Sequence, residues 1–148
     1  MRIGEILGLK AGDFDFTRKT VFIKRSKSLR GKLVSPKTAC SAGVVDLPSW
    51  LSEMVEKFFK DNGYKPDQLV FNTSRTSINR MLEEHAKMAG VKVISPHGLR
   101  HSIASRMIAA GVNPLVVSKH LRHSSMAITL STYTHLFAGM AAGVMDKI

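Results

Sequence analysis

The sequence predicts an α+β fold that is mainly α-helical, with a small antiparallel β-sheet near the N-terminus. Apolar residues recur at helical spacing through most of the chain after residue 48, whereas runs rich in β-branched and aromatic residues concentrate between residues 19 and 47. Glycine, proline or asparagine stands between most of these segments. The 148 residues can bury a substantial core, and no linker or repeat is evident. We therefore expect residues 1–148 to form a single domain.

Each predicted element follows from local spacing and from start and stop signals. The first helix has no capping residue before it, while Pro48, Pro96 and Pro114 each stand where a helix begins and Gly63 and Gly111 where one ends. The expected elements before residue 74 are a helix at 2–9, strands at 19–26, 33–34 and 43–47, a helix at 48–61 and a short extended piece at 69–71. Either Ser74 or Thr76 could cap the next helix, which runs to residue 90. Further helices are expected at 95–110, 114–121, 125–130 and 137–145.

The helix expected at 95–110 carries an apolar stripe. Leu99, Ile103 and Met107 recur at intervals of four and predict the face that packs inward. Arg100 is then expected at the edge of this face.

Charge favours a polyanionic partner. Twenty-two Lys and Arg residues face eleven Asp and Glu residues, giving a formal net charge of +11 and a pI near 10.2. Such an excess favours nucleic acid through counterion release, although a merely solubilising surface would give the same numbers. The single cysteine, Cys40, excludes an internal disulfide and fits a reducing cytoplasm. No apolar run is long enough to span a membrane, and Glu5 and Lys10 interrupt any signal-peptide core.

Cofactor motifs are missing from the sequence. It has no glycine-rich nucleotide loop and no C-x-x-C or H-E-x-x-H zinc pattern. We therefore expect neither a small-molecule cofactor nor a metal.

His97 and Arg100 form the first candidate anion site. They are three residues apart in the first turn of the predicted helix at 95–110, so they lie on neighbouring faces. The unpaired N–H groups of that turn favour an anion, and a phosphate there could meet amides, a guanidinium and an imidazole together. An exposed His and Arg on an amphipathic helix would show the same pattern.

Tyr133 is the candidate nucleophile, and it follows the segment Leu121-Arg122-His123-Ser124-Ser125. His123 lies between two predicted helices and could donate a hydrogen bond to a phosphate oxygen. A tyrosine has a pKa of about 10, so it needs a base and nearby positive charge to attack. Taken alone, Tyr133 is better explained as a packing aromatic. The order of H-x-x-R, then histidine, then tyrosine favours chemistry on a nucleic-acid backbone.

This order resembles the catalytic domain of the tyrosine recombinases, the phage integrase family. The resemblance spans nearly the whole chain and rests on four segments. These are Met1-Arg2-Ile3-Gly4-Glu5-Ile6-Leu7, Pro36-Lys37-Thr38-Ala39-Cys40-Ser41, His97-Gly98-Leu99-Arg100-His101, and Leu121-Arg122-His123-Ser124-Ser125 with Thr132-Tyr133-Thr134-His135. Each motif is weak singly, but all six family positions occur in family order.

The resemblance implies a tyrosine recombinase catalytic-domain fold and a mechanism. Tyr133 would attack the scissile phosphate of double-stranded DNA, forming a 3′-phosphotyrosyl link and freeing a 5′-hydroxyl. Arg2 and Arg100 would hold the non-bridging oxygens. The link stores the bond energy for rejoining, so no metal or high-energy cofactor is implied. A homo-oligomer on DNA, dimer or tetramer, is implied as well.

The remaining positions take supporting roles under the same resemblance. Lys37 would be the general acid for the departing oxygen, His97 would assist proton transfer with the tyrosine, and His123 would hydrogen-bond the phosphate. Glu5 is expected to orient its neighbours.

The sequence departs from the family at three places. Relatives carry further helices and a DNA-binding domain before the position of Arg2, so we expect the chain to lack this N-terminal part. Gly43 stands where relatives often carry arginine. Arg122 replaces a familiar glycine, and it could add a phosphate contact or alter the turn.

Three other functions fit parts of the pattern. Residues 103–121 resemble a helix-turn-helix, in which Lys119 and Arg122 would face DNA without catalysis. A type IB topoisomerase shares the tyrosine chemistry but relaxes supercoils. A structural protein with a basic surface would bind DNA weakly and without specificity.

Overall fold

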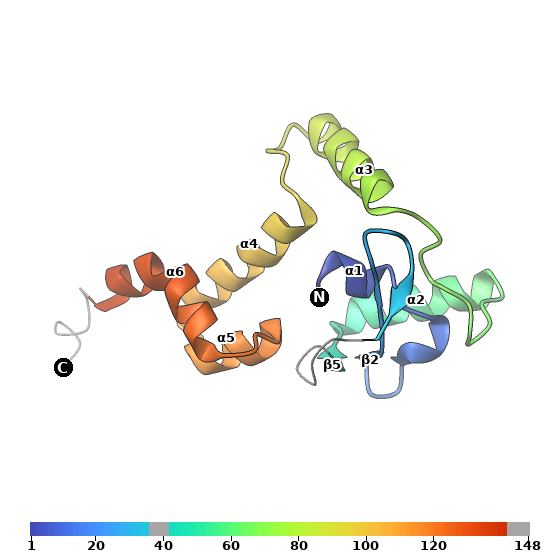
Figure 1. Cartoon of the computed structure of the whole chain (residues 1–148), viewed down its shortest axis with the longest axis horizontal. Helices are drawn as coiled ribbons and strands as arrows, with labels where there is room; N and C mark the ends of the chain where they lie inside the picture. Colours follow the sequence, from blue (N-terminus) through green and yellow to red (C-terminus); the bar gives the residue numbers. More distant parts are fainter. Residues whose placement is uncertain (36–41, 142–148) are drawn as a thin grey trace. The chain divides into compact units, whose positions relative to one another are not determined.

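A computed structural model of the chain, drawn in Figure 1, describes residues 1–35 and 42–141. It confirms a helix-rich fold with antiparallel strands near the N-terminus. The chain forms two compact units that divide after Pro96, and each is described by itself below. Lys37 lies outside the described residues.

The strands of the first unit form two small antiparallel sheets rather than one. In the larger sheet, β2 (Thr20–Ile23) lies between β1 (Phe14–Asp15) and β5 (Gly43–Asp46). The second sheet pairs β3 (Ser26–Lys27) with β4 (Leu33–Val34).

The single strand expected at 19–26 is therefore interrupted, and Asp13 explains why. Its carboxylate is buried and pairs with Arg25 at 2.5 Å and with Lys24 at 3.4 Å. Because both cations turn toward this one buried charge, residues 24 and 25 leave the ladder that β2 makes with β5. No local pattern in the sequence marks this convergence.

The first helix is shorter than expected. Helix α1 spans Ile3–Ile6, and the Glu5 carboxylate caps it by accepting a hydrogen bond from the Arg2 amide at 2.7 Å. The prediction of an uncapped helix at 2–9 was wrong for two reasons. A Cβ on Gly8 would lie 3.0 Å from the Arg25 carbonyl, so the chain approaches another segment closely there. Lys10 then pairs with Leu69 in an isolated bridge.

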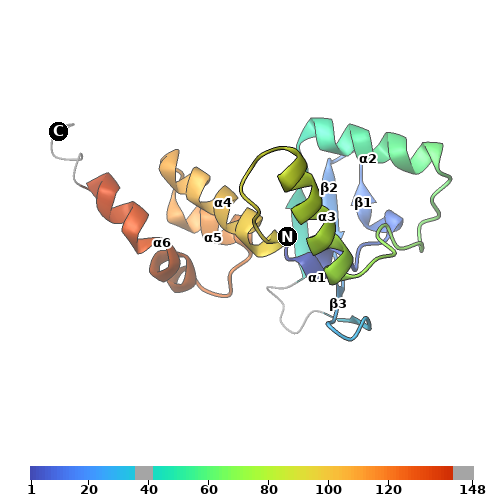
Figure 2. The same cartoon turned by 90° about the horizontal axis from the view of Figure 1, so that it is seen from above.

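Helix α2 (Ser49–Asp61) lies alongside the larger sheet of the first unit, as Figure 2 shows. Phe59 forms the contact, with its ring centroid 5.2 Å from that of Phe14 and 4.9 Å from that of Tyr64. A short 3₁₀ helix, η1 (Ala11–Asp13), precedes β1. The last helix of the first unit is α3 (Arg75–Met88). Ser74 caps α3 by accepting a hydrogen bond from the Ser77 amide, as one of the two predicted alternatives proposed.

Up to residue 141, the second unit contains three helices, α4 (Pro96–Ala109), α5 (Pro114–Leu121) and α6 (Met126–Ala141). They enclose a compact cluster of five buried residues: Ala104, Ile108, Val117, Leu121 and Tyr133. Asn113 caps α5 by accepting a hydrogen bond from the Leu115 amide at 2.8 Å.

The inward face of α4 differs from the predicted stripe. Leu99 and Ile103 are 47% and 44% exposed, whereas Arg100, Ala104 and Ile108 are buried at intervals of four. A buried arginine would be costly without a partner. Arg100 finds one in the backbone of the turn after α5, as described below, and this non-local contact sets the rotation of α4.

Helix α6 bends, as Figure 1 shows, and the residue that departs from helical geometry is Tyr133. The sequence predicted two helices with Tyr133 between them, and the structure joins them into one interrupted helix. Tyr133 itself has φ −117° and ψ 15°, outside the helical range. Within the described part of the chain, no helix has both the length and the apolar character needed to cross a bilayer.

Candidate active site

The Tyr133 side chain is enclosed at the centre of the second unit. Only 3% of the residue is exposed, and its ring belongs to the buried cluster with Ile108 and Leu121. Its hydroxyl is 2.7 Å from Nδ1 of His101, within hydrogen-bonding distance. The tyrosine therefore presents its oxygen to an imidazole of α4 rather than to a purely apolar wall.

A second imidazole continues this contact. Nε2 of His101 lies 2.8 Å from Nε2 of His97, and the two rings meet edge to face with centroids 4.4 Å apart. His97 and His101 are four residues apart on α4 and so lie on one face of the helix. The hydroxyl and the two imidazoles thus form a continuous chain, in the order Tyr133, His101, His97.

Burial and charge shift the pKa values in this chain. Burial raises the pKa of the Tyr133 hydroxyl above its ordinary value, although the positive charge of Arg100 acts in the opposite direction. Burial also lowers the pKa of His101, and the charges of His97 and Arg100 lower it further. Both groups are therefore neutral at pH 7. A neutral phenol beside a neutral imidazole is the arrangement that proton abstraction requires.

Arg100 joins α4 to the end of α5. The residue is 9% exposed, and its Nη2 donates a hydrogen bond to the backbone carbonyl of Leu121. This contact satisfies part of the buried guanidinium and holds it close enough to Tyr133 to influence the pKa of the hydroxyl. Arg100 can thus stabilise negative charge that develops beside Tyr133.

The turn that closes α5 positions the Leu121 carbonyl. Arg122 adopts a left-handed conformation, with φ 53° and ψ 49°. Its amide donates to the Lys119 carbonyl at 2.9 Å, and the His123 amide donates to the Ser118 carbonyl at 3.1 Å. This pattern is the usual way to end a helix, and glycine is its usual residue. Arg122 therefore occupies the left-handed position that glycine usually takes in this turn.

The left-handed backbone conformation of Arg122 is unfavourable for a residue with a Cβ atom, and this predicts a difference in stability between two substitutions. Both Arg122→Gly and Arg122→Ala remove the side chain, but only glycine adopts the left-handed conformation without steric cost. We expect the glycine variant to be more stable than the alanine variant by about 1 kcal/mol. Chemical denaturation of the two proteins tests this, and equal stabilities would contradict it.

His123 follows the same turn, and its side chain contacts Thr129 of α6. Its Nδ1 lies 2.8 Å from the hydroxyl of Thr129, which is fully buried. A fixed hydroxyl partner sets the orientation of the imidazole. His123 is itself half-buried, so it is accessible at the edge of the unit.

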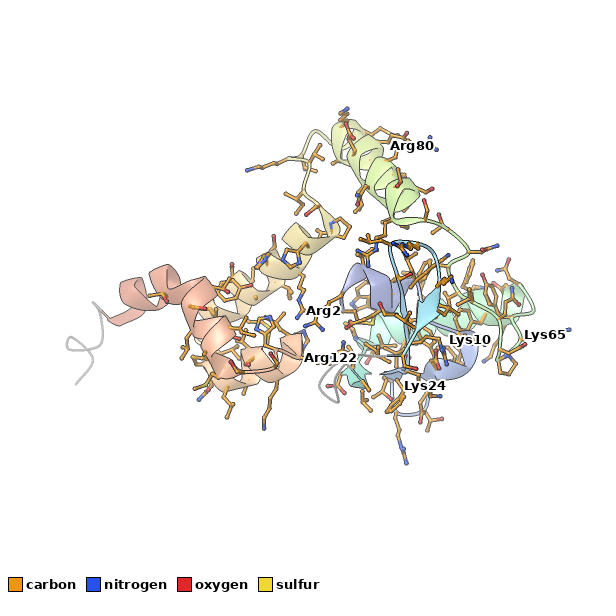
Figure 3. The ribbon with its side chains drawn as sticks, in the orientation of Figure 1. Arg2, Lys10, Lys24, Lys65, Arg80 and Arg122 are labelled. Atoms are coloured by element: carbon orange, nitrogen blue, oxygen red, sulfur yellow. The ribbon has the colours of Figure 1, made fainter. Side chains whose placement is uncertain are left out.

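Arg2 belongs to the first unit, where it lies at the start of α1, as labelled in Figure 3. Its Nη1 donates to the Glu5 carboxylate at 3.1 Å, and Glu5 is 4% exposed. The same carboxylate accepts the Arg2 amide. Glu5 therefore restrains both the backbone and the side chain of Arg2.

Four of the six predicted catalytic residues lie in the second unit: His97, Arg100, His123 and Tyr133. The sequence prediction did not include His101, although the segment that resembles the family's H-x-x-R motif ends with this residue in the present chain. Its spacing of four from His97 was a usable signal, because that spacing places two histidines on one helical face. Of the two residues predicted to contact DNA, Lys119 is exposed and Arg122 is half-buried.

The chain is similar in sequence to known proteins over most of its length. The profile of the phage integrase family matches residues 1–139. A tyrosine recombinase of Pseudothermotoga lettingae is 28% identical over 141 residues, which covers 92% of this chain and 45% of the relative. A XerC-like tyrosine recombinase of Caldanaerobacter subterraneus subsp. tengcongensis is 30% identical over 178 residues, covering all of this chain and 46% of the relative. The chain thus spans less than half the length of these two relatives.

Solved structures show the same fold. A Tn1549 transposon integrase bound to a circular intermediate DNA matches with a TM-score of 0.79 at 20% identity, covering all of this chain and 55% of that one. The crystal structure of XerA recombinase matches with a TM-score of 0.69 at 21% identity, covering 90% of this chain and 51% of that one. The structural likeness concerns the fold, and the profile match shows descent: this chain belongs to the phage integrase family.

Proposed function

We propose that this protein is a site-specific recombinase that cuts and rejoins double-stranded DNA through a 3′-phosphotyrosyl intermediate on Tyr133. The observation that carries the proposal is the contact of the Tyr133 hydroxyl with His101 beside the buried Arg100. A purely structural tyrosine needs neither a chain of imidazoles nor a nearby guanidinium. The curated relatives, named as tyrosine recombinases, support the same activity.

The proposed first step exchanges one phosphodiester bond for another. The Tyr133 oxygen forms a bond to phosphorus, and the bond from phosphorus to the 5′-oxygen breaks. The hydroxyl proton leaves through the histidines of α4, and Lys37 donates a proton to the departing 5′-oxygen. Attack by a 5′-hydroxyl of another strand reverses the step and releases Tyr133.

The arginines and His123 would bind the phosphate. Arg2 and Arg100 present planar guanidinium groups suited to two non-bridging oxygens, and they oppose the negative charge that grows in the transition state. His123, oriented by Thr129, would add one hydrogen bond. Glu5 would keep Arg2 in place.

DNA is the proposed partner because of charge and chemistry together. The net charge of +11 favours a polyanion, and the Tn1549 integrase, which shares the fold, was solved in complex with DNA. Exchange between two duplexes requires a nucleophile for each cleaved strand. We therefore propose that several copies assemble on DNA, as a dimer or tetramer.

A covalent-capture experiment tests the proposed function without knowledge of the target site. The protein is incubated with a pool of duplexes that carry a nick and random flanking sequence, so that the short 5′-fragment diffuses away after cleavage and traps the intermediate. We expect a protein–DNA adduct that survives denaturation, is attached to the 3′-phosphate and yields phosphotyrosine on hydrolysis. DNA that is bound but never captured would exclude the proposed chemistry and favour a non-catalytic binding module.

The basic surface predicts a steep salt dependence of DNA binding. Neutralising about four phosphates would lower affinity roughly 100-fold between 50 and 200 mM salt. Lys119→Gln is expected to reduce the slope of log affinity against log salt by about one, as for a single phosphate contact. Lys57→Gln is the matched control, because Lys57 is paired with Asp61 on α2. Fluorescence anisotropy at several salt concentrations measures the DNA affinity of both variants. An affinity that does not change with salt concentration would contradict the prediction.

A further inference from the structure

We propose that His101 is the group that accepts the Tyr133 proton, and that it passes a proton on to His97. This proposal rests on the proposed phosphotyrosyl chemistry and assigns the base within it. The sequence-based expectation gave this task to His97, which the structure places one imidazole away from the hydroxyl.

The two contacts of His101 constrain its protonation. A neutral imidazole carries one N–H and one acceptor nitrogen. If Tyr133 donates to Nδ1, then Nε2 carries the hydrogen and donates to His97. A phenol is a much stronger acid than a neutral imidazole N–H, so Tyr133 as donor and Nδ1 as acceptor is the favoured pairing. The observed distances of 2.7 and 2.8 Å then describe two hydrogen bonds that point in the same direction.

Proton transfer along these bonds balances without any further reactant. The Tyr133 O–H bond breaks as an N–H bond forms on Nδ1 of His101. The Nε2–H bond of His101 breaks as an N–H bond forms on Nε2 of His97. His101 ends neutral with its proton on the other nitrogen, and His97 ends as an imidazolium. The same steps in reverse return a proton to Tyr133 when the DNA is rejoined.

Accessibility increases along this route. Tyr133 is 3% exposed, His101 is half-buried and His97 is exposed. A buried hydroxyl cannot give its proton directly to water, so it needs a group that connects it with the surface. His101 provides that connection within two hydrogen bonds.

Charge around His101 supports its role as a proton acceptor that stays neutral at rest. The ionisable groups that face it are His97 and Arg100 on α4 and Tyr133 on α6. Burial lowers the pKa of His101, and the neighbouring His97 and Arg100 lower it further, which keeps its acceptor nitrogen available at pH 7. Arg100 also favours the tyrosinate that forms when the proton leaves.

Substitution of His101 by asparagine tests the relay. The amide oxygen of asparagine can occupy the position of Nδ1 and accept the tyrosine hydrogen bond, but it cannot take up or forward a proton. We expect the single-turnover rate of adduct formation to fall about 10²- to 10⁴-fold, with DNA affinity unchanged within twofold. His85→Asn is the control, because His85 is an exposed histidine on α3 whose Nδ1 lies 2.7 Å from the Met81 carbonyl of the same helix. An unchanged rate in His101→Asn would overturn the proposal.

Chemical rescue separates proton transfer from a packing role. In His101→Ala, added imidazole can enter the space left by the side chain and act as a base. We expect the rate of adduct formation to recover at least tenfold, with a pH dependence that follows the imidazole used. If imidazole gives no recovery while the variant remains folded and binds DNA, His101 has a structural role only.

Nitrogen NMR tests the resting arrangement without any need for activity. The ¹⁵N shifts of His101 in the wild-type protein should show an unprotonated Nδ1 and a protonated Nε2. A protonated Nδ1 would reverse the hydrogen bonds and overturn the relay, even if adducts form. Failure of the wild-type protein to form adducts would instead reject the proposed function, so the two failures are distinguishable.

Discussion

Tyr133→Phe is expected to abolish formation of the covalent DNA adduct while leaving the fold and DNA binding intact. Phenylalanine retains the ring that packs against Ile108 and Leu121, and it removes only the hydroxyl. Loss of the attacking oxygen removes the covalent route altogether, so we expect a decrease of at least about 10⁴-fold, the scale seen when other covalent enzymes lose a nucleophile. The lost hydrogen bond to His101 should change stability by only about 1 kcal/mol.

The chain offers a matched control for this substitution. Tyr64 is its only other tyrosine, and it lies in the first unit with its hydroxyl 3.4 Å from the Val70 carbonyl. Tyr64→Phe removes the same hydroxyl group and should form adducts at the wild-type rate. An adduct that persists in Tyr133→Phe and disappears in Tyr64→Phe would show that the nucleophile had been assigned to the wrong tyrosine.

Ile108→Ala is expected to destabilise the second unit by about 3 kcal/mol, within the usual range for deletion of a large buried aliphatic group. Ile108 is fully buried between Ala104, Val117 and Tyr133. The small cluster leaves few neighbours that could move into the space. Ile108→Val removes one methylene and should cost only about 1 kcal/mol. The pair of substitutions therefore measures how tightly the core around Tyr133 is packed.

Hydrogen exchange is the suitable measurement for this prediction. The only tryptophan, Trp50, lies on α2 in the first unit, so its fluorescence would not report on Ile108. Amide protection in α4 and α5, followed by mass spectrometry, gives the opening free energy of the second unit directly. A loss of less than about 1 kcal/mol in Ile108→Ala would mean that the cluster collapses around the vacancy.

Capping residues and prolines in the sequence correctly predicted where several helices begin and end. Pro114 and Leu121 bound α5 as expected, and Ser74 caps α3. The rotation of α4 was not predictable in this way, because an apolar stripe through Leu99 is locally more plausible than one through Arg100. The deciding contact, from Arg100 to the Leu121 carbonyl, joins residues 21 positions apart.

In the candidate site, too, some residues could be predicted from the sequence, whereas a contact between distant residues could not. Motif order predicted the histidine and arginine of α4 and the tyrosine of α6 as site residues, because these residue types occur in the order of the family. The role of His101 depends on Tyr133, which lies 32 positions away, so the sequence alone gave no reason to pair them. The interruption after β2 likewise depends on the attraction of Lys24 and Arg25 to Asp13, across a turn and a strand.

The bend in α6 places Tyr133 at the junction of two helical arms. The arm before it buries Thr129, which anchors that arm to the rest of the second unit. The arm after it begins beyond a residue whose dihedral angles are not helical, so no uninterrupted helical ladder ties its direction to that of the first arm. Tyr133 is therefore the hinge residue about which the second arm could change direction. A change in the direction of the second arm would therefore displace the Tyr133 backbone less than the far end of that arm.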